Sequence, residues 1–246
     1  MTTRRCLHSW PLLLVAAFLC LSPGCASRRG AVHPELVVAA DNQDALALSD
    51  ALEALIAAGQ DTPADREYAY DIVRKHHEDT AASMFAQAVV TGRLVQQKGL
   101  RAADLVPEIE RCARRSREID PDFRDGAATR LLGTLYVMAP AVLLQHGDSE
   151  VGVDLLEGLV QAHPDVLENH LRLAEAYIAL ADPVPAGPHL CRCLADKSAL
   201  RRDDQLLLQQ LIDSTGLSRE RCSPRDSGDL SPDARGARST ARPVVP

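Results

Sequence analysis

Apolar residues recur along most of this chain with the spacing of an amphipathic helix, and they almost nowhere alternate with polar residues as in a β-strand. Leu48, Leu52 and Leu55 show this spacing, and Thr62 followed by Pro63 is a typical helix start. The pattern predicts an all-α fold of about nine helices joined by short turns. The expected helices begin near residues 44, 62, 79, 105, 123, 149, 167, 185 and 202.

Two stretches of the chain share the pattern of a tetratricopeptide repeat, in which small residues let two antiparallel helices approach each other. The matching positions are Leu132, Gly133, Tyr136, Gly147, Gly152, Leu156 and Pro164 in the first stretch, then Leu173, Ala174, Tyr177, Ala186 and Leu190. A single helical pair cannot bury its apolar face, so we expect antiparallel pairs stacked into an α-solenoid over residues 44–217. The alternative is a compact bundle with chance matches.

The first 24 residues have the features of an export signal. Arg4 and Arg5 precede an apolar run from Pro11 to Leu21. That run is too short to span a bilayer, which takes about 20 residues, but it has the length of a signal-peptide core. We therefore expect residues 1–24 to be removed on export.

The end of this signal is similar to a bacterial lipobox, through Leu21, Gly24 and Cys25. The resemblance implies that Cys25 becomes a lipid-modified first residue, which would anchor the chain stably to a membrane. Ala26 and Ser27 follow the cysteine in place of an acidic residue, which implies the periplasmic face of the outer membrane. The alternative is an ordinary signal peptide that is cut nearby and leaves Cys25 as a free thiol.

Composition excludes several binding classes. The net charge of −7 argues against a general nucleic-acid binder, which needs a basic face. Aromatic residues make up only 3% of the chain, too few for platforms that stack bases or sugars. Residues 25–43 are expected to be a tether between lipid and fold. Residues 218–246 are rich in Pro, Ser and charged residues, which predicts a disordered tail.

A longer set of positions between residues 83 and 215 carries a family resemblance. The positions are Asp125, Gly126, Arg130, Leu132, Gly133, Tyr136, Ala139, Pro140, Gly147, Asp148, Pro164, Asn169, Leu173, Ala174 and Glu175. Together with the insertion Met138–His146, which ordinary repeats lack, they resemble the T component of TRAP transporters, periplasmic tetratricopeptide lipoproteins known as TatT. The insertion departs from the family pattern, because it lacks a second Pro and the Ser expected before Gly147.

The resemblance implies a partner and no chemistry of the chain's own. A TatT protein is thought to work with the solute-binding P component of a TRAP transporter, and a membrane tether makes each encounter partly intramolecular. The matching positions suggest Arg130, Asp148 and Asn169 as partner-binding residues, although structural roles would explain them equally well. A general envelope-assembly scaffold is the alternative partner role, and a homo-oligomer stays open.

A third interpretation is a carrier that holds a small apolar ligand between its helices. The apolar residues of the insertion region would line such a site: Val137, Met138, Val142, Leu143 and Leu144. The same residues would serve equally well as a plug in the core.

No set of residues has the pattern of a catalytic or metal site, so we expect no enzyme, no metal and no cofactor. His76 and His77 are adjacent, and neighbours on a helix diverge by about 100°, unlike the paired histidines of a zinc protease. His189, Cys191 and Cys193 are spaced by two and would face apart on a helix.

Two further groups of residues have open interpretations. The basic residues Arg111, Arg114, Arg115 and Arg117 are expected on a solvated face, with a docking patch for an acidic partner as the alternative. Cys112, Cys191, Cys193 and Cys222 remain besides Cys25 after removal of the signal. A disulfide from Cys222 to Cys191 or Cys193 is one option, and Cys193 is expected as a packed small residue.

Overall fold

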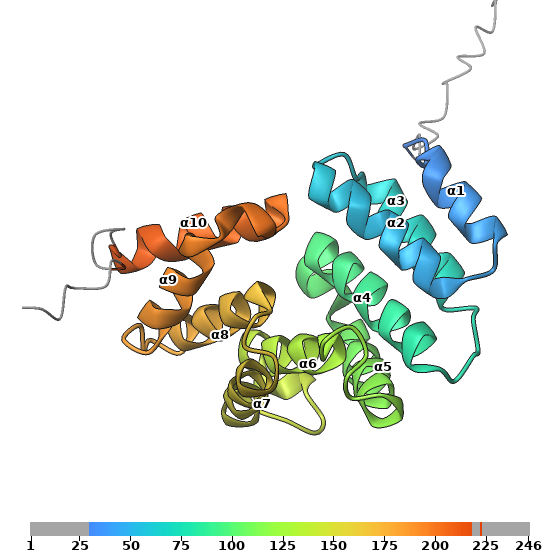
Figure 1. Cartoon of the computed structure of the whole chain (residues 1–246). Coiled ribbons are helices and arrows are strands. Elements are labelled where there is room, and N and C mark those ends of the chain that lie inside the picture. Colours follow the sequence, from blue (N-terminus) through green and yellow to red (C-terminus); the bar gives the residue numbers. More distant parts are fainter. Residues whose placement is uncertain (1–29, 218–221, 223–246) are drawn as a thin grey trace, which may run out of the picture.

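The computed structural model describes residues 30–217 and Cys222, and every regular element in that part of the chain is helical (Figure 1). The expectation of an all-α fold is confirmed. Within the described residues there are ten α-helices: α1 (Pro34–Asp41), α2 (Ala45–Ala58), α3 (Pro63–Val73), α4 (Ala81–Lys98), α5 (Val106–Ile119), α6 (Ala127–Met138), α7 (Ser149–Ala162), α8 (Leu167–Ala179), α9 (Ala186–Ala195) and α10 (Arg202–Thr215). Three 3₁₀ helices are η1 (Gly99–Leu105), η2 (Ala141–Leu143) and η3 (Lys197–Ala199).

The nine expected helices correspond to α2 through α10, and α1 is the one that the sequence pattern missed. The prediction of a tether over residues 25–43 was wrong for the part from Pro34 onward. Leu36 of α1 is fully buried against the neighbouring helices, and the backbone N–H of His33 donates to Asp65 Oδ1 at 2.8 Å. A helix of eight residues is too short to display a convincing apolar period.

Several expectations fall on residues that the structure does not describe. These are the export signal over residues 1–24, the lipidation of Cys25, and the disordered tail over residues 218–246 apart from Cys222.

Successive helices pack side by side along a curved path (Figure 1). The path runs from α1 through α6 and α7 to α10, and α10 returns to contact α2. The apolar core follows this path in clusters instead of gathering at one centre. One cluster joins α1 to α4, a second joins α4 to α6, a third joins α7 and α8, and a fourth joins α8 to α10.

Helices α6 and α7 approach each other closely at two glycines. A Cβ atom on Gly133 would lie 2.6 Å from Leu156 Cγ, and one on Gly152 would lie 2.8 Å from the carbonyl oxygen of Gly133. Both distances are shorter than any normal contact, so a side chain would force the helices apart. The expected role of these small residues is confirmed.

Glu53 is at the centre of an ion-pair network that joins the two ends of this curved path of helices, which we call the arc. Its carboxylate accepts hydrogen bonds from Arg93 at 2.6 and 2.7 Å and from Arg201 at 2.8 Å. Burial raises the pKa of Glu53, but the hydrogen bonds and charges of the two arginines outweigh this and hold the pKa below its ordinary value. The carboxylate therefore stays ionised and holds α2 to the start of α10.

Candidate functional site

A cavity of about 730 Å³, which we call the inner cavity, lies on the inner side of the arc. Helices α4, η1, α5 and α6 supply an apolar wall that includes Phe85, Val89, Val106, Ile109, Leu131 and Leu135. Charged residues come from α2, α8 and the start of α10, among them Glu53, Glu168, Arg172, Arg201 and Asp204. The volume and the mixture of apolar and polar residues are those of a small-molecule site.

Four of the five arginines that line the inner cavity have carboxylate partners. Arg93 and Arg201 pair with Glu53, Arg124 pairs with Asp50, and Arg172 pairs with Asp204. The fifth, Arg130 on α6, forms no ion pair within the described part of the chain. Burial lowers the pKa of Arg130, which nevertheless remains charged at neutral pH because a guanidinium loses its proton only at very alkaline pH.

Arg130 and Asn169, two of the residues selected by resemblance, lie together. Arg130 donates a hydrogen bond from NH1 to Asn169 Oδ1 at 2.7 Å, which links α6 to α8. Asn169 is completely buried, and its Nδ2 finds no acceptor among residues 30–217 and Cys222. The asparagine therefore fixes one end of the guanidinium from behind the cavity wall.

Asp148, the third residue of that set, has a different place. Its Oδ1 accepts a hydrogen bond from the backbone N–H of Val151 at 3.0 Å, and it is the N-cap of α7. It does not line the inner cavity. A helix-capping role is therefore enough to explain Asp148, in agreement with the structural role that the sequence analysis gave as an alternative.

The insertion places only two of the five suggested ligand-lining residues at the inner cavity, namely Met138 and Leu143. The other three require a correction. Val137 packs against the cluster of α7 and α8, Leu144 packs against the cluster of α4 to α6, and Val142 is 89% exposed. The apolar run diverges in this way because η2 and the turns around it send successive side chains in different directions.

Glu110 on α5 holds the insertion in place, a role that sequence reasoning missed. This side chain is 1% exposed. It accepts hydrogen bonds from Tyr136 Oη at 3.0 Å and from the backbone N–H groups of Gln145 and His146, both at 2.8 Å. The signal in the sequence was weak: a single glutamate directly after the apolar Ile109, in the helix expected from residue 105. The insertion is therefore fixed by a buried carboxylate.

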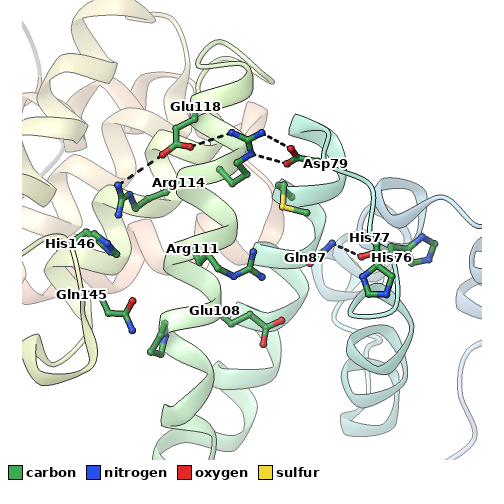
Figure 2. A pocket seen from close by; sticks show the side chains of 13 residues that line it. His76, His77, Asp79, Gln87, Glu108, Arg111, Arg114, Glu118, Gln145 and His146 are labelled. Atoms are coloured by element: carbon green, nitrogen blue, oxygen red, sulfur yellow. Dashed lines mark hydrogen bonds and ion pairs between the residues drawn. The ribbon is translucent and has the colours of Figure 1, made fainter.

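A second hollow, of about 850 Å³ and polar, lies where α5 meets the turn before α4 and the end of the insertion (Figure 2). Its lining includes His76, His77, Arg111, Arg114, Arg115 and His146. Arg115 pairs with Asp79 and Glu118, so part of the basic run is neutralised locally. Arg111, Arg115 and Arg117 are exposed, which fits both a solvated face and a docking patch. Among the described residues, no cluster of three or more His, Cys, Asp or Glu side chains could hold a metal ion.

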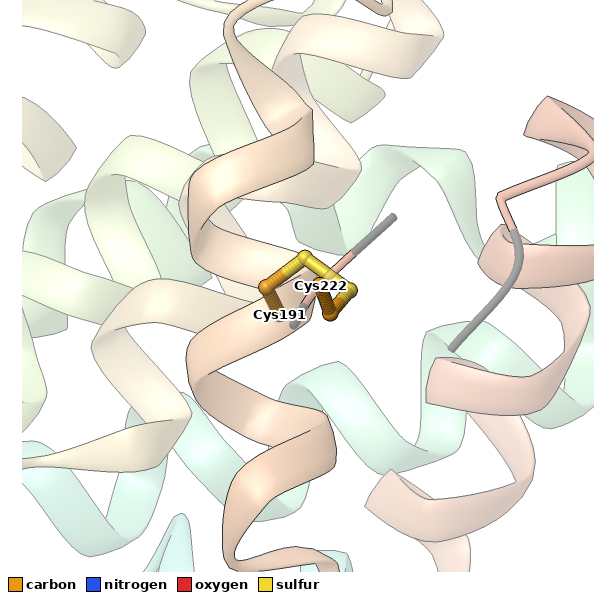
Figure 3. The surroundings of a disulfide bond; sticks show 2 residues. All are labelled: Cys191 and Cys222. Atoms are coloured by element: carbon orange, nitrogen blue, oxygen red, sulfur yellow. A yellow bond between two sulfur atoms is a disulfide. The ribbon is translucent and has the colours of Figure 1, made fainter. Parts of the chain in front are cut away.

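The four cysteines that the structure describes form one disulfide and two buried thiols. Cys191 on α9 forms a disulfide with Cys222, beyond α10 (Figure 3), which settles one of the two pairings that were open. Cys193 is packed in the core as expected. Burial raises the pKa of Cys112 to about 11 and that of Cys193 to about 12, so both thiols stay protonated and unreactive at neutral pH.

No protein-family model and no curated protein sequence matches this chain. None of the helices in the described residues has both the length and the apolar character needed to cross a membrane. What bears on function is therefore the inner cavity, the residues around it, and the sequence pattern.

Proposed function

We propose that this chain is a membrane-tethered periplasmic scaffold of tetratricopeptide-like helical pairs that docks the solute-binding component of a TRAP-type transporter. One observation carries the proposal. Arg130, Asn169 and the insertion were selected by their resemblance to the T component, and they converge on one region: Arg130 and Leu143 line the inner cavity, and Asn169 holds Arg130. The fold thus brings parts of two predicted repeats into contact beside the cavity.

The arrangement of the core supports a solenoid. Each apolar cluster joins consecutive helices, and close approach at Gly133 and Gly152 is what the repeat pattern requires. Stacked helical pairs create an extended concave surface, which suits the binding of a folded partner.

The anchoring part of the proposal rests on the lipobox-like sequence that ends at Cys25. A disulfide between Cys191 and Cys222 is consistent with it, because such bonds persist in oxidising compartments such as the bacterial periplasm. A lipid on Cys25 would confine the scaffold to a membrane face and raise the local concentration of a docked partner.

The test is a pull-down of the tagged full chain from membranes of its own host, followed by mass spectrometry of the proteins that are recovered. We expect a solute-binding protein in stoichiometric amount. The control is Cys25→Ala, which should move the chain into the soluble fraction and reduce the yield of the solute-binding protein from membranes. Recovery of outer-membrane assembly or cell-wall proteins instead would contradict the proposal and favour a general envelope scaffold.

A further inference from the structure

We propose that the inner cavity binds a small amphipathic carboxylate, with the guanidinium of Arg130 on the carboxylate group and the apolar wall around the hydrocarbon tail. The inference goes beyond docking, since it concerns a ligand of the isolated chain. It also differs from a purely apolar ligand, because it assigns a charged anchor.

The first argument is the state of Arg130. A guanidinium that is largely removed from water costs free energy unless a counter-charge compensates it. The other arginines of the cavity have such partners in direct contact, whereas Arg130 is hydrogen-bonded only to the neutral amide of Asn169, and the charge of Glu168 acts on it without an ion pair. The cavity therefore holds one arginine that has no carboxylate in direct contact among the described residues.

The second argument is geometric. Asn169 occupies NH1 of Arg130, at 2.7 Å, and no acceptor in the described part of the chain takes Nε or NH2. These two nitrogens form the edge of the guanidinium that pairs with a carboxylate through two parallel hydrogen bonds. The asparagine thus orients the group and leaves its pairing edge for a ligand.

The third argument is how the charges around the cavity are paired. Ion pairs occupy the guanidinium groups of Arg93, Arg124, Arg172 and Arg201; their acidic partners are Asp50, Glu53, Glu175, Asp203 and Asp204. This leaves Arg130 as the arginine of the cavity that a ligand can pair with. Glu168 also lines the cavity and forms no ion pair with any described residue, so its charge opposes an anion and disfavours a dianion most.

The fourth argument is the space available for a tail. The apolar wall of α4 to α6 borders the same cavity as Arg130. Gly92 on α4 also borders it, and a Cβ atom there would have no neighbour within 4 Å. Room next to an apolar wall suits a hydrocarbon chain, whose removal from water is favourable.

The experiment compares three probes that share one tail, n-octanoate, n-octanol and n-octylamine, by calorimetric titration of the purified full chain at neutral pH. We expect octanoate to bind about tenfold or more tightly than octanol, the factor that one charge-assisted pairing supplies. Octylamine should bind more weakly than either. Equal binding of octanoate and octanol, or no binding of octanoate, would overturn the proposal.

Variants locate the site. Arg130→Met should reduce octanoate affinity to that for octanol, and Arg130→Lys should retain part of the preference. The matched control is Arg124→Met, which removes a cavity arginine already paired with Asp50 and should leave the preference intact. Gly92→Phe should fill the cavity and abolish binding of both octanoate and octanol.

Glu168→Gln tests whether the bound carboxylate lies near this glutamate. Removing the negative charge should tighten octanoate binding, and an unchanged octanoate affinity would contradict a carboxylate placed beside Arg130. Thermal unfolding of each variant shows whether it folds. If Arg130→Met does not fold, the octanoate affinity of Arg130→Lys still tests the role of this arginine. The calorimetric titration contains no partner protein. A pull-down that recovers no solute-binding protein would therefore leave the octanoate result unaffected.

Discussion

His170 on α8 and His189 on α9 form a hydrogen-bonded pair. His170 Nε2 lies 2.8 Å from the carbonyl oxygen of Pro164, which can only accept, so Nε2 carries a proton. The Nδ1 atoms of the two histidines are 2.9 Å apart, and one proton between them makes the hydrogen bond. Burial and the nearby His170 lower the pKa of His189. The fold therefore favours the neutral form of His189.

The folded chain should lose stability as the pH falls below about 6.5, the ordinary pKa of histidine, because the unfolded chain takes up the His189 proton first. We predict that His189→Gln weakens this pH dependence. Urea unfolding at pH 7.5 and pH 5 measures it. The control is His77→Gln, at an exposed position, which should keep the slope of the parent chain. Identical slopes for both variants would contradict the prediction.

Glu110→Ala should destabilise the fold by about 3 kcal/mol, since it leaves two backbone N–H groups and the Tyr136 hydroxyl without an acceptor. Hydrogen exchange in residues 139–147 should accelerate as well. Glu118→Ala is the control on the same helix, because its side chain is exposed and should cost less than about 1 kcal/mol. A similar loss in both variants would show that Glu110 has no special role.

At the scale of the helix, two glycines of α7 make a matched pair. Gly152→Ala should destabilise the chain by about 1–3 kcal/mol, because its Cβ atom would collide with the backbone of α6. Gly158→Ala meets nothing within 4 Å and should stabilise α7 by about 0.5–1 kcal/mol. Chemical denaturation distinguishes the two. Equal changes would mean that the close contact between α6 and α7 is not limiting.

Helices were predictable from the sequence because their signal is local: apolar period, caps and terminal glycines lie within each segment. Short α1 lacked enough turns for this signal. The cavity was not predictable, since it depends on which side chains the curved path brings together. Val142 and Leu143 are neighbours in sequence, yet one is exposed and the other lines the cavity. Likewise, resemblance pointed to Arg130 and Asn169, but only the fold shows that they touch.

For the whole molecule, the contact between α2 and α10 decides whether the arc stays closed. Glu53→Gln removes the charge that two arginines share, and we predict a loss of about 3 kcal/mol together with a larger radius of gyration. Urea unfolding and small-angle X-ray scattering measure these changes. The control is Glu67→Gln, in a half-exposed pair with Lys98 that should contribute at most about 1 kcal/mol. An unchanged radius would count against closure by Glu53.

The pair of Glu53 and Arg201 also has a kinetic consequence, because it joins residues 148 positions apart while most helices contact their neighbours in sequence. Local contacts form with little loss of chain entropy, so the distant pair should form last in folding and break first in unfolding. Loss of Glu53 would then speed unfolding far more than it slows folding. One carboxylate thus governs the lifetime of the closed arc as well as its stability.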